Sequence, residues 1–306
     1  MKRIIIHEVG MRDGLQMEKQ VVPMQQKIKW IEGIIDAGVD IVQVGSFVHP
    51  EKVPQMADTD RLFAYLREHP DKVRNAVLSG LVLNEKGLDR GFDCGVELFC
   101  MGVSASETHS RKNTGMSIAE ATDRIVAMAR RALQADKKVQ LSVQSAFGCG
   151  YEGPVPHERV LGIVQKYLDA GLKRISLADT AGHATPDNVE KLYEAIFKLD
   201  DSVECACHFH NTYGMGIANC YAAMKVGVQN YESSIAGLGG CPFTKIAGGN
   251  VCTEDLVHML GRMNLRTDVG LQRLTAVAND VAGFFAREMS GVVYKIGPIA
   301  AFGPGH

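Results

Sequence analysis

Two histidines stand one residue apart in the segment CHFHNTYGMGIAN, with two cysteines close by. His208, His210, Cys205 and Cys207 are the ligand types that zinc prefers. Residues 203–210, however, are typical of a strand, in which successive side chains point to opposite faces. The histidines therefore share one face and the cysteines the other, so the four cannot bind one ion. The pattern fits either a metal-binding H-x-H pair that needs further ligands, or two buried histidines with satisfied hydrogen bonds.

Composition limits the class of protein. The chain has 306 residues, of which 46% are hydrophobic and 22% charged, enough for a sizeable core. A net charge of -2 without a long basic run argues against binding to nucleic acid or to an anionic membrane. No segment approaches the ~20 apolar residues of a membrane span, and the first ten residues do not form a secretion signal. Eight scattered cysteines suit free thiols in a reducing compartment, so we expect a cytoplasmic protein.

Apolar segments that are typical of strands alternate with amphipathic segments that are typical of helices. The expected strands are residues 3–9, 40–47, 73–82, 95–103, 138–147, 174–179, 203–210 and 230–236. The expected helices include residues 24–37, 117–134, 157–170 and 186–198. One junction recurs in DAGVDIVQVG, DCGVELFCMG, DAGLKRISLAD and KVGVQNYESSIAG, where a helix ends at a glycine cap and a buried strand begins. Eight such units predict a (β/α)8 barrel.

The predicted barrel is a single catalytic domain of residues 1–290, followed by a Gly/Pro-rich tail of residues 291–306. An extra helix is expected near residues 269–287, after the eighth unit. A doubly wound open sheet is the competing fold. It would usually have fewer strands and a glycine-rich first turn, whereas the first turn here, GMRDGLQ, is not a G-x-G-x-x-G fingerprint.

Polar residues fall at the carboxyl ends of the expected strands, where barrel enzymes have their active sites. In chain order these residues are Arg12, Asp13, Gln43, Ser46, Asp179, His208 and His210. After the eighth strand, the loop GLGGCPFTKIAGGN carries a thiol, Cys241, and an amide, Asn250. Its glycine content alone fits a tight connection or a phosphate cradle.

Five segments taken together carry a family resemblance. They are EVGMRDGLQMEK, SFVHPEKVPQMAD, SLADTAGHATP, HFHNTYGMGIAN and AGLGGCPFTKIAGGNVCTED. In this order the chain, from about Ile5 to about Leu260, resembles the hydroxymethylglutaryl-CoA lyase family, a branch of the metal-dependent barrel lyases and Claisen-type synthases. The resemblance implies a (β/α)8 barrel that uses a divalent cation, Mg2+ or Mn2+. Such an enzyme splits 3-hydroxy-3-methylglutaryl-CoA, a CoA thioester, into acetyl-CoA and acetoacetate.

The resemblance also implies roles for single residues. The implied metal ligands are Asp13, His208, His210 and Asn250. Arg12 is implied to contact the reacting carbonyl, Cys241 to lie on a mobile loop near the reaction, and Asp179 to assist proton movement. Each has a structural alternative, because Arg12 could simply pair with its neighbour, Cys241 could be a small buried hydrophobe and Asp179 could cap a helix. The coenzyme A moiety has three candidate contacts, which could equally be solvated: Gln16, Lys19 and Asn113.

The chemistry of such a cleavage asks for these residue types. A base must take the hydroxyl proton, a charge must hold the substrate oxygens, and the leaving enolate must be stabilised. A cation bound by one carboxylate, two imidazoles and one amide keeps open positions for the substrate hydroxyl and a neighbouring oxygen. Arg12 is placed to stabilise the enolate. Cys241 is a candidate proton donor on a loop that could close, and His208 and Asp179 are both candidates for the base.

Two departures from the family leave the acyl group open. The second strand has Gln43 where these lyases carry an acid. The fifth strand reads VQLSVQSAFG, with Gln140, Ser142 and Gln144, in place of an arginine-glycine-tyrosine run. We assign Gln43, Ser46 and Gln144 to the substrate pocket.

Three functions of different class fit the sequence. The first is a metal-dependent lyase acting on 3-hydroxy-3-methylglutaryl-CoA or a related ester, and we expect it to be a homodimer. The second is a Claisen-type synthase or aldolase of the same superfamily that uses a 2-oxo acid. The third is a sugar-phosphate barrel enzyme or a ligand binder, in which the GLGG segment holds phosphate and the histidines are incidental.

Overall fold

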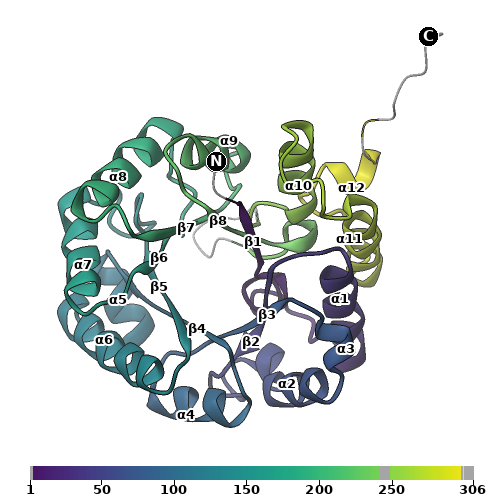
Figure 1. Ribbon diagram of the computed structural model, residues 1–306, viewed down its shortest axis with the longest axis horizontal. Coiled ribbons are helices and arrows are strands. Elements are labelled where there is room, and N and C mark those ends of the chain that lie inside the picture. The colour runs from purple at the N-terminus through teal and green to yellow at the C-terminus, as the bar shows by residue number, and fades with distance from the viewer. Residues whose placement is uncertain (1–2, 241–248, 298, 300–306) are drawn as a thin grey trace.

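Eight parallel strands form a closed barrel in chain order, with β8 paired to β1 (Figure 1). The computed structural model describes residues 3–240, 249–297 and 299. The strands are β1 (Ile5–Glu8), β2 (Ile41–Ser46), β3 (Val77–Leu81), β4 (Leu98–Ser104), β5 (Lys138–Gln144), β6 (Arg174–Asp179), β7 (Glu204–Phe209) and β8 (Asn230–Ser233). The predicted (β/α)8 barrel is confirmed.

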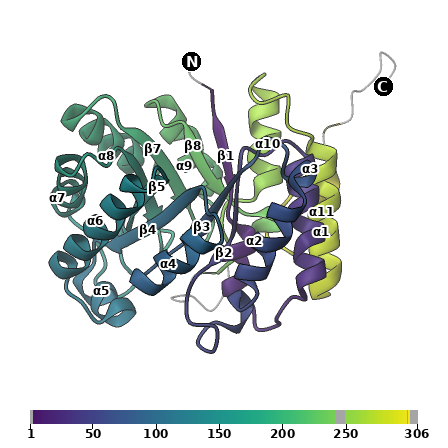
Figure 2. The same cartoon turned by 60° about the horizontal axis from the view of Figure 1, so that its bottom comes forward.

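Helices surround the barrel and alternate with its strands (Figures 1 and 2). They are α1 (Met24–Asp36), α2 (Thr59–Glu68), α3 (Pro70–Val73), α4 (Glu85–Asp93), α5 (Glu107–Thr114), α6 (Ile118–Gln134), α7 (His157–Asp169), α8 (Pro186–Leu199), α9 (Gly216–Lys225), α10 (Thr253–Arg262), α11 (Leu271–Phe285) and α12 (Val293–Ile296). Three short helical turns are η1 (Gly10–Gly14), η2 (Pro54–Met56) and η3 (Ile235–Gly237). In Figure 2 the strands run downward from the N-terminus, so the barrel mouth at their carboxyl ends faces the bottom.

The repeated helix-to-strand junction forms as the sequence predicts. Gly38, Gly95, Gly171 and Gly227 have φ between +77° and +100°, a backbone conformation that suits glycine at the end of a helix. The strand at 174–179 agrees with its prediction to the residue. The third strand begins only at Val77, because the preceding residues form α3.

Two apolar regions fill the fold. The larger lies between strands and helices and contains Trp30, Tyr167 and Tyr193, each no more than 1% exposed. The smaller lies inside the barrel, where Ile41 and Leu98 pack with the first residues of β1 and β3. Ile5, Ile41, Val77 and Leu98 are the first residues of their strands, so this cluster, which also contains Leu81 and Cys100, lies mainly at the end of the barrel away from the polar site residues.

The extra helix after the eighth unit is α11, which packs against α1. Trp30 of α1 meets the ring of Phe284 edge-on, with centroids 5.5 Å apart, and its indole N–H donates to Asp280 at 2.7 Å. Further along the chain, α12 buries Tyr294, whose hydroxyl accepts the backbone N–H of Met289 at 2.8 Å.

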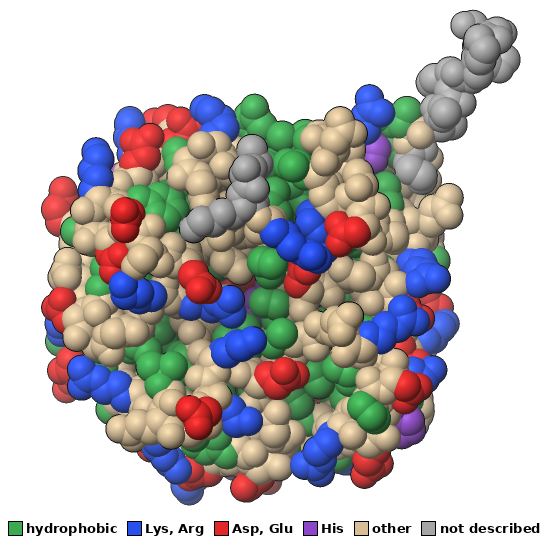
Figure 3. All heavy atoms as spheres, viewed as in Figure 1, with side chains coloured by type: hydrophobic (Ala, Val, Ile, Leu, Met, Phe, Trp, Pro, Cys, Tyr) green, Lys and Arg blue, Asp and Glu red, His purple; other side chains and the backbone are tan. Residues whose placement is uncertain are grey.

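The surface carries charges of both signs. On the face shown in Figure 3, the Lys and Arg side chains are interspersed with Asp and Glu. In the described part of the chain, no helix combines the length and apolar character needed to cross a membrane.

Candidate active site

The first loop at the barrel mouth presents Arg12 and Asp13 from a single π-helical turn, η1. The carbonyl of Val9 accepts the backbone N–H of Arg12 at 3.1 Å and of Asp13 at 2.8 Å, which tightens the turn. Gly14 allows this turn to approach the last loop, since a Cβ there would lie 2.6 Å from the Cβ of Leu238. The first and last loops of the barrel are therefore in direct contact.

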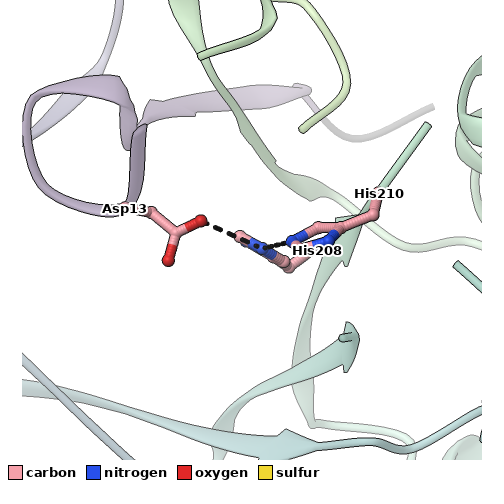
Figure 4. Close-up of side chains that lie close together, drawn as sticks. All are labelled: Asp13, His208 and His210. Carbon is pink, nitrogen blue, oxygen red and sulfur yellow. Dashed lines mark hydrogen bonds and ion pairs between the residues drawn. The ribbon is translucent and has the colours of Figure 1, made fainter. Parts of the chain in front are cut away.

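Asp13 meets the two histidines of β7 and its carboxyl end (Figure 4). The Nε2 atoms of His208 and His210 are 3.2 Å apart, and Nε2 of His208 is 3.8 Å from Oδ2 of Asp13. One ligand atom from each of these three residues lies within 4.8 Å of the others. The shared face of the two histidines is thus confirmed, while Cys205 and Cys207 lie in the core between barrel and helices.

Asn250 completes the group of four residues that the resemblance selects. Its Nδ2 donates to Oδ2 of Asp13 at 2.8 Å and to the carbonyl of Leu238 at 3.1 Å. Its Oδ1 is buried and has no hydrogen-bond partner among the described residues. A buried amide oxygen without a partner beside a carboxylate and two imidazoles suits a divalent cation.

The protonation states of Asp13 and His210 also suit a cation. Burial tends to lower the pKa of His208, but the hydrogen bond with Glu232 and the charge of Asp13 raise it. Burial tends to raise the pKa of Asp13, but the charges of Arg12 and His208 outweigh it and hold the pKa well below its usual value. Burial and the charge of His208 lower the pKa of His210 to about 4. At neutral pH Asp13 is therefore ionised and His210 is neutral, the forms in which these side chains bind metals.

Arg12 links the first loop to the second strand. Its Nε donates to Oε1 of Gln43 at 2.5 Å, and its Nη1 donates to Oδ1 of Asp13 at 2.6 Å. The Gln43 side chain is buried. Arg12 thus forms the ion pair with its neighbour Asp13 that was the structural alternative, and Asp13 is itself a candidate metal ligand.

Asp179 lies at the end of β6 and is buried, which raises its pKa to about 6. Its Oδ1 accepts the backbone N–H of His183 at 2.7 Å, and its Oδ2 has no hydrogen-bond partner among the described residues. Asp179 is in register with Phe209, and so on the strand face opposite to His208. One oxygen of Asp179 therefore caps the turn that follows β6, and the other could accept a proton.

The remaining predicted site residues are more dispersed. Ser46, buried, and Gln144, half-buried, end β2 and β5 at the barrel mouth. Lys19 lines a hollow of about 450 Å³ together with Glu18, Arg287 and the glycines before residue 241. Cys241 itself lies outside the described residues.

Asn113 and Lys19, two of the predicted contacts for coenzyme A, lie on different sides of the barrel. Asn113 is on α5, where its amide is 3.3 Å from Nε2 of His109, on the other side of the barrel from α1 and the loop that carries Lys19 (Figures 1 and 2). Gln16 has a buried Oε1 without a hydrogen-bond partner among the described residues. One coenzyme A molecule would have to cross the barrel mouth to contact both sides.

Sequence reasoning missed Glu232, a buried acid on β8. Its Oε2 is 2.9 Å from Nδ1 of His208, and its Oε1 accepts Nε2 of Gln140 at 2.6 Å. Burial tends to raise the pKa of Glu232, but the hydrogen bond and the charge of His208 lower it to about 2. The available signal was an acid inside the buried segment NYESS, where a charge needs a partner.

The last loop is anchored by two buried carboxyl groups. Glu8 accepts the backbone N–H groups of Gly10 at 2.7 Å and Ile235 at 2.9 Å, so it joins the first loop to the last. Glu254 accepts the N–H of Ala236 at 3.0 Å, in a turn where Ala236 has the left-handed φ of +57°. Burial raises the pKa of Glu8 to about 7 and that of Glu254 to about 8.

The raised pKa of Glu254 predicts that stability falls as the pH rises from about 4.5 to about 8. A carboxyl group whose pKa is about 8 in the folded protein and near 4.5 when unfolded stabilises the fold fully below pH 4.5, and this contribution is lost as the pH rises through 8. Between these values the free energy of unfolding should fall by about 1.4 kcal/mol per pH unit for the one proton involved. Urea unfolding at pH 5 to 9 should show a shallower decline for Glu254→Gln. Wild type and the control Glu51→Gln, which changes an exposed residue, should keep the steeper decline of the free energy of unfolding. Parallel curves for all three proteins would show that Glu254 is not responsible for the decline.

Comparisons with known proteins show the family to which the chain belongs. A family model described as HMGL-like matches residues 3–281. Hydroxymethylglutaryl-CoA lyase YngG of Bacillus subtilis (strain 168) is 35% identical over 277 residues, 90% of this chain and 91% of that protein. The 3-hydroxy-3-isohexenylglutaryl-CoA/hydroxy-methylglutaryl-CoA lyase of Pseudomonas aeruginosa is 36% identical over 273 residues, 89% of this chain and 90% of that protein.

A solved structure extends the similarity to three dimensions. An HMG-CoA lyase from Acinetobacter baumannii, in complex with coenzyme A and 3-methylmalate, matches with a TM-score of 0.90 at 31% identity. The match covers 99% of this chain and 97% of that one. The chain therefore belongs to the HMGL-like family and is a carbon–carbon lyase of the hydroxymethylglutaryl-CoA lyase type.

Proposed function

We propose that the chain cleaves 3-hydroxy-3-methylglutaryl-CoA or a related 3-hydroxyacyl-CoA to acetyl-CoA and a keto acid, with Mg2+ or Mn2+ held by Asp13, His208, His210 and Asn250. The observation that carries this proposal is the convergence of three ligand atoms within 4.8 Å beside the unpartnered Oδ1 of Asn250. Arg12 touches the same carboxylate, so a permanent positive charge stands next to the ligand group. The names of the relatives support a CoA thioester as the substrate.

The reaction can be followed through the residues of this chain. A base takes the proton of the 3-hydroxyl group, the hydroxyl carbon becomes a ketone, and the carbon–carbon bond breaks. The electron pair passes to the thioester enolate, which takes up a proton to become acetyl-CoA. A bound cation would supply a Lewis acid that lowers the hydroxyl pKa and fixes the substrate oxygens. Arg12 stabilises the negative charge that develops on the enolate oxygen.

The contacts of His208 argue against it as the base and leave Asp179 as the other candidate. Nδ1 of His208 is taken by Glu232, and its Nε2 faces His210 and Asp13, so no ring nitrogen remains for a substrate proton. Asp179 lies on the opposite strand face, but its buried Oδ2 has no hydrogen-bond partner among the described residues. Its pKa of about 6 is close to the value that a base needs near neutral pH, so we keep it as the candidate base. Cys241 stays our candidate for the acid that protonates the enolate.

The direct test is an assay of purified protein on a panel of 3-hydroxyacyl-CoA esters with Mg2+ or Mn2+, following the release of acetyl-CoA. We expect at least one ester to be cleaved, with activity lost on chelation and recovered when the cation is restored. Activity that survives exhaustive chelation would contradict the metal site. Condensation of a 2-oxo acid with acetyl-CoA, without cleavage of any ester, would indicate a synthase instead.

Gln43 should influence which ester is preferred. Its amide oxygen accepts from Arg12, so a glutamate there would pair with the guanidinium and add a negative charge beside the ligands. We expect Gln43→Glu to shift the ratio of kcat/KM values by about tenfold toward hydroxymethylglutaryl-CoA and away from the best other ester, the size of a ~1.4 kcal/mol difference. The exposed variant Gln25→Glu adds the same charge on α1 and should leave the ratio unchanged. If wild type already cleaves hydroxymethylglutaryl-CoA efficiently and Gln43→Glu keeps the ratio, Gln43 does not set specificity.

Three further expectations stay predictions. They are the homodimer, the cytoplasmic location, and the division into a domain of residues 1–290 and a tail of residues 291–306. Sedimentation velocity of the purified chain tests the first of them.

A further inference from the structure

Inside the barrel, the side chain of Glu232 on β8 contacts His208 on β7 and Gln140 on β5. It is in register with His208 across β7 and β8, and its side chain faces the barrel interior with that of Gln140 on β5. Glu232 is 8% exposed and Gln140 3%, so neither contact is shared with bulk water. Among the described residues, His208 is the ion-pair partner of Glu232 and no Lys or Arg competes for it. One carboxylate oxygen is therefore directed at the imidazole of His208, while His7 and Ser176 also act on the carboxylate.

An ionised carboxylate can only accept hydrogen bonds, which has two effects here. Gln140 must present its Nε2 to Oε1, which fixes one half of the carboxylate. The 2.9 Å contact of Oε2 then requires a hydrogen on Nδ1 of His208. In the neutral ring this leaves the lone pair on Nε2, the atom that faces His210 and Asp13.

We propose that Glu232, held in place by Gln140, is a positioning residue that fixes the tautomer and ring orientation of His208 so that Nε2 can bind a divalent cation. This inference rests on the metal site of the proposed function. A carboxylate behind a metal-binding histidine typically accounts for a 10- to 100-fold difference in affinity. The chain thus has a negative charge next to Nδ1 of His208, on the side of the ring away from His210 and Asp13. The contact of Arg12 with Gln43, by contrast, involves a neutral side chain.

Two variants separate the hydrogen bond from mere packing. Glu232→Met fills similar space but gives His208 no acceptor. The double variant Glu232→Gln/Gln140→Glu exchanges the two side chains. Its carboxylate at position 140 accepts only, so the amide at position 232 must turn its N–H2 group toward it and its oxygen toward Nδ1 of His208. The exchange therefore preserves the hydrogen on Nδ1, although the negative charge has moved from position 232 to position 140.

Titration with Mn2+ alone, with the free ion measured by electron paramagnetic resonance, is the first readout. Relative to wild type, we expect Glu232→Met to bind Mn2+ roughly 10- to 100-fold more weakly. The double variant should recover most of this loss. Wild-type affinity in Glu232→Met would overturn the inference while leaving the metal site intact. If wild type binds no Mn2+, the metal site of the proposed function fails instead.

Nitrogen-15 NMR of labelled histidine rings is the second readout, because it reports the tautomer without any metal or activity. The His208 signal is assigned by its absence in His208→Ala, and spectra are recorded at rising alkaline pH until the ring is neutral. We expect the hydrogen on Nδ1 in wild type and in the double variant, and its loss from Nδ1 in Glu232→Met. A hydrogen on Nε2 of the neutral wild-type ring overturns the inference, even if Glu232→Met fails to fold.

Discussion

Replacement of His208 by alanine is expected to lower kcat by at least about a thousandfold and to weaken Mn2+ binding strongly. Metal catalysis contributes several kcal/mol, and each ~1.4 kcal/mol is a factor of ten in rate. No other imidazole on that strand face can replace the lost ligand, because His210 already occupies its own place 3.2 Å away. Loss of the ring also leaves the buried Glu232 without its partner.

Cys207→Ala is the matched control for this variant. Cys207 precedes His208 on β7 but faces the core, so its loss should lower stability slightly and leave Mn2+ affinity and turnover unchanged. Both variants are to be compared by circular dichroism, Mn2+ titration and ester cleavage. A His208→Ala protein that binds Mn2+ and cleaves the ester at near wild-type levels would remove this residue from the site.

Substitution of Arg12 by lysine should lower kcat by at least about a hundredfold while changing the affinity for the cation little. Arg12 contacts Gln43 through Nε and Asp13 through Nη1 at the same time, which a single ammonium group on a flexible stem cannot reproduce. A hundredfold loss is the scale expected when one donor to the transition state is removed. Steady-state kinetics at saturating Mn2+, combined with an Mn2+ titration, measure both quantities.

The opposite pattern would identify Arg12 as structural. In that case the lysine variant would bind Mn2+ poorly or unfold at lower temperature, while turnover per bound cation stayed intact. Arg67→Lys is the comparison, because it makes the same exchange at an exposed position near the end of α2 and should leave turnover and Mn2+ affinity unchanged.

The sequence was informative wherever local periodicity decides the structure. Alternation along β7 separated His208 and His210 from the two cysteines, and the glycine caps located the starts of several strands. The eighth strand ended sooner than expected, at Ser233, because the residues that follow form the turn η3 around Ala236. In that turn, Ile235 and Ala236 donate their backbone N–H groups to Glu8, 227 residues away, and Glu254, 18 residues away, and neither contact can be inferred from a local pattern.

Glu232 was missed for a related reason. Whether an acid in a buried strand faces the barrel or the helices depends on the register between strands, which is set only when the barrel closes. The pairing of His208 with Glu232 and the contact with Gln140, 92 residues away, are properties of that closure. By contrast, Asp13 could be expected near the two histidines from sequence, because it belongs to a motif with a family resemblance, and the structure brings the three residues together.

During synthesis on the ribosome, the ligand group cannot assemble until nearly the whole barrel has been made. The strands that close the barrel, β1 and β8, come from opposite ends of it, and Asn250 reaches Asp13 across 237 residues of chain. Contacts of such long range form late, because the entropy of closing the loop must be overcome first. A cation that binds only the closed barrel would add RT ln(1 + [L]/Kd) to its stability. It would therefore stabilise the pairing of β1 with β8, the first and last strands of the barrel.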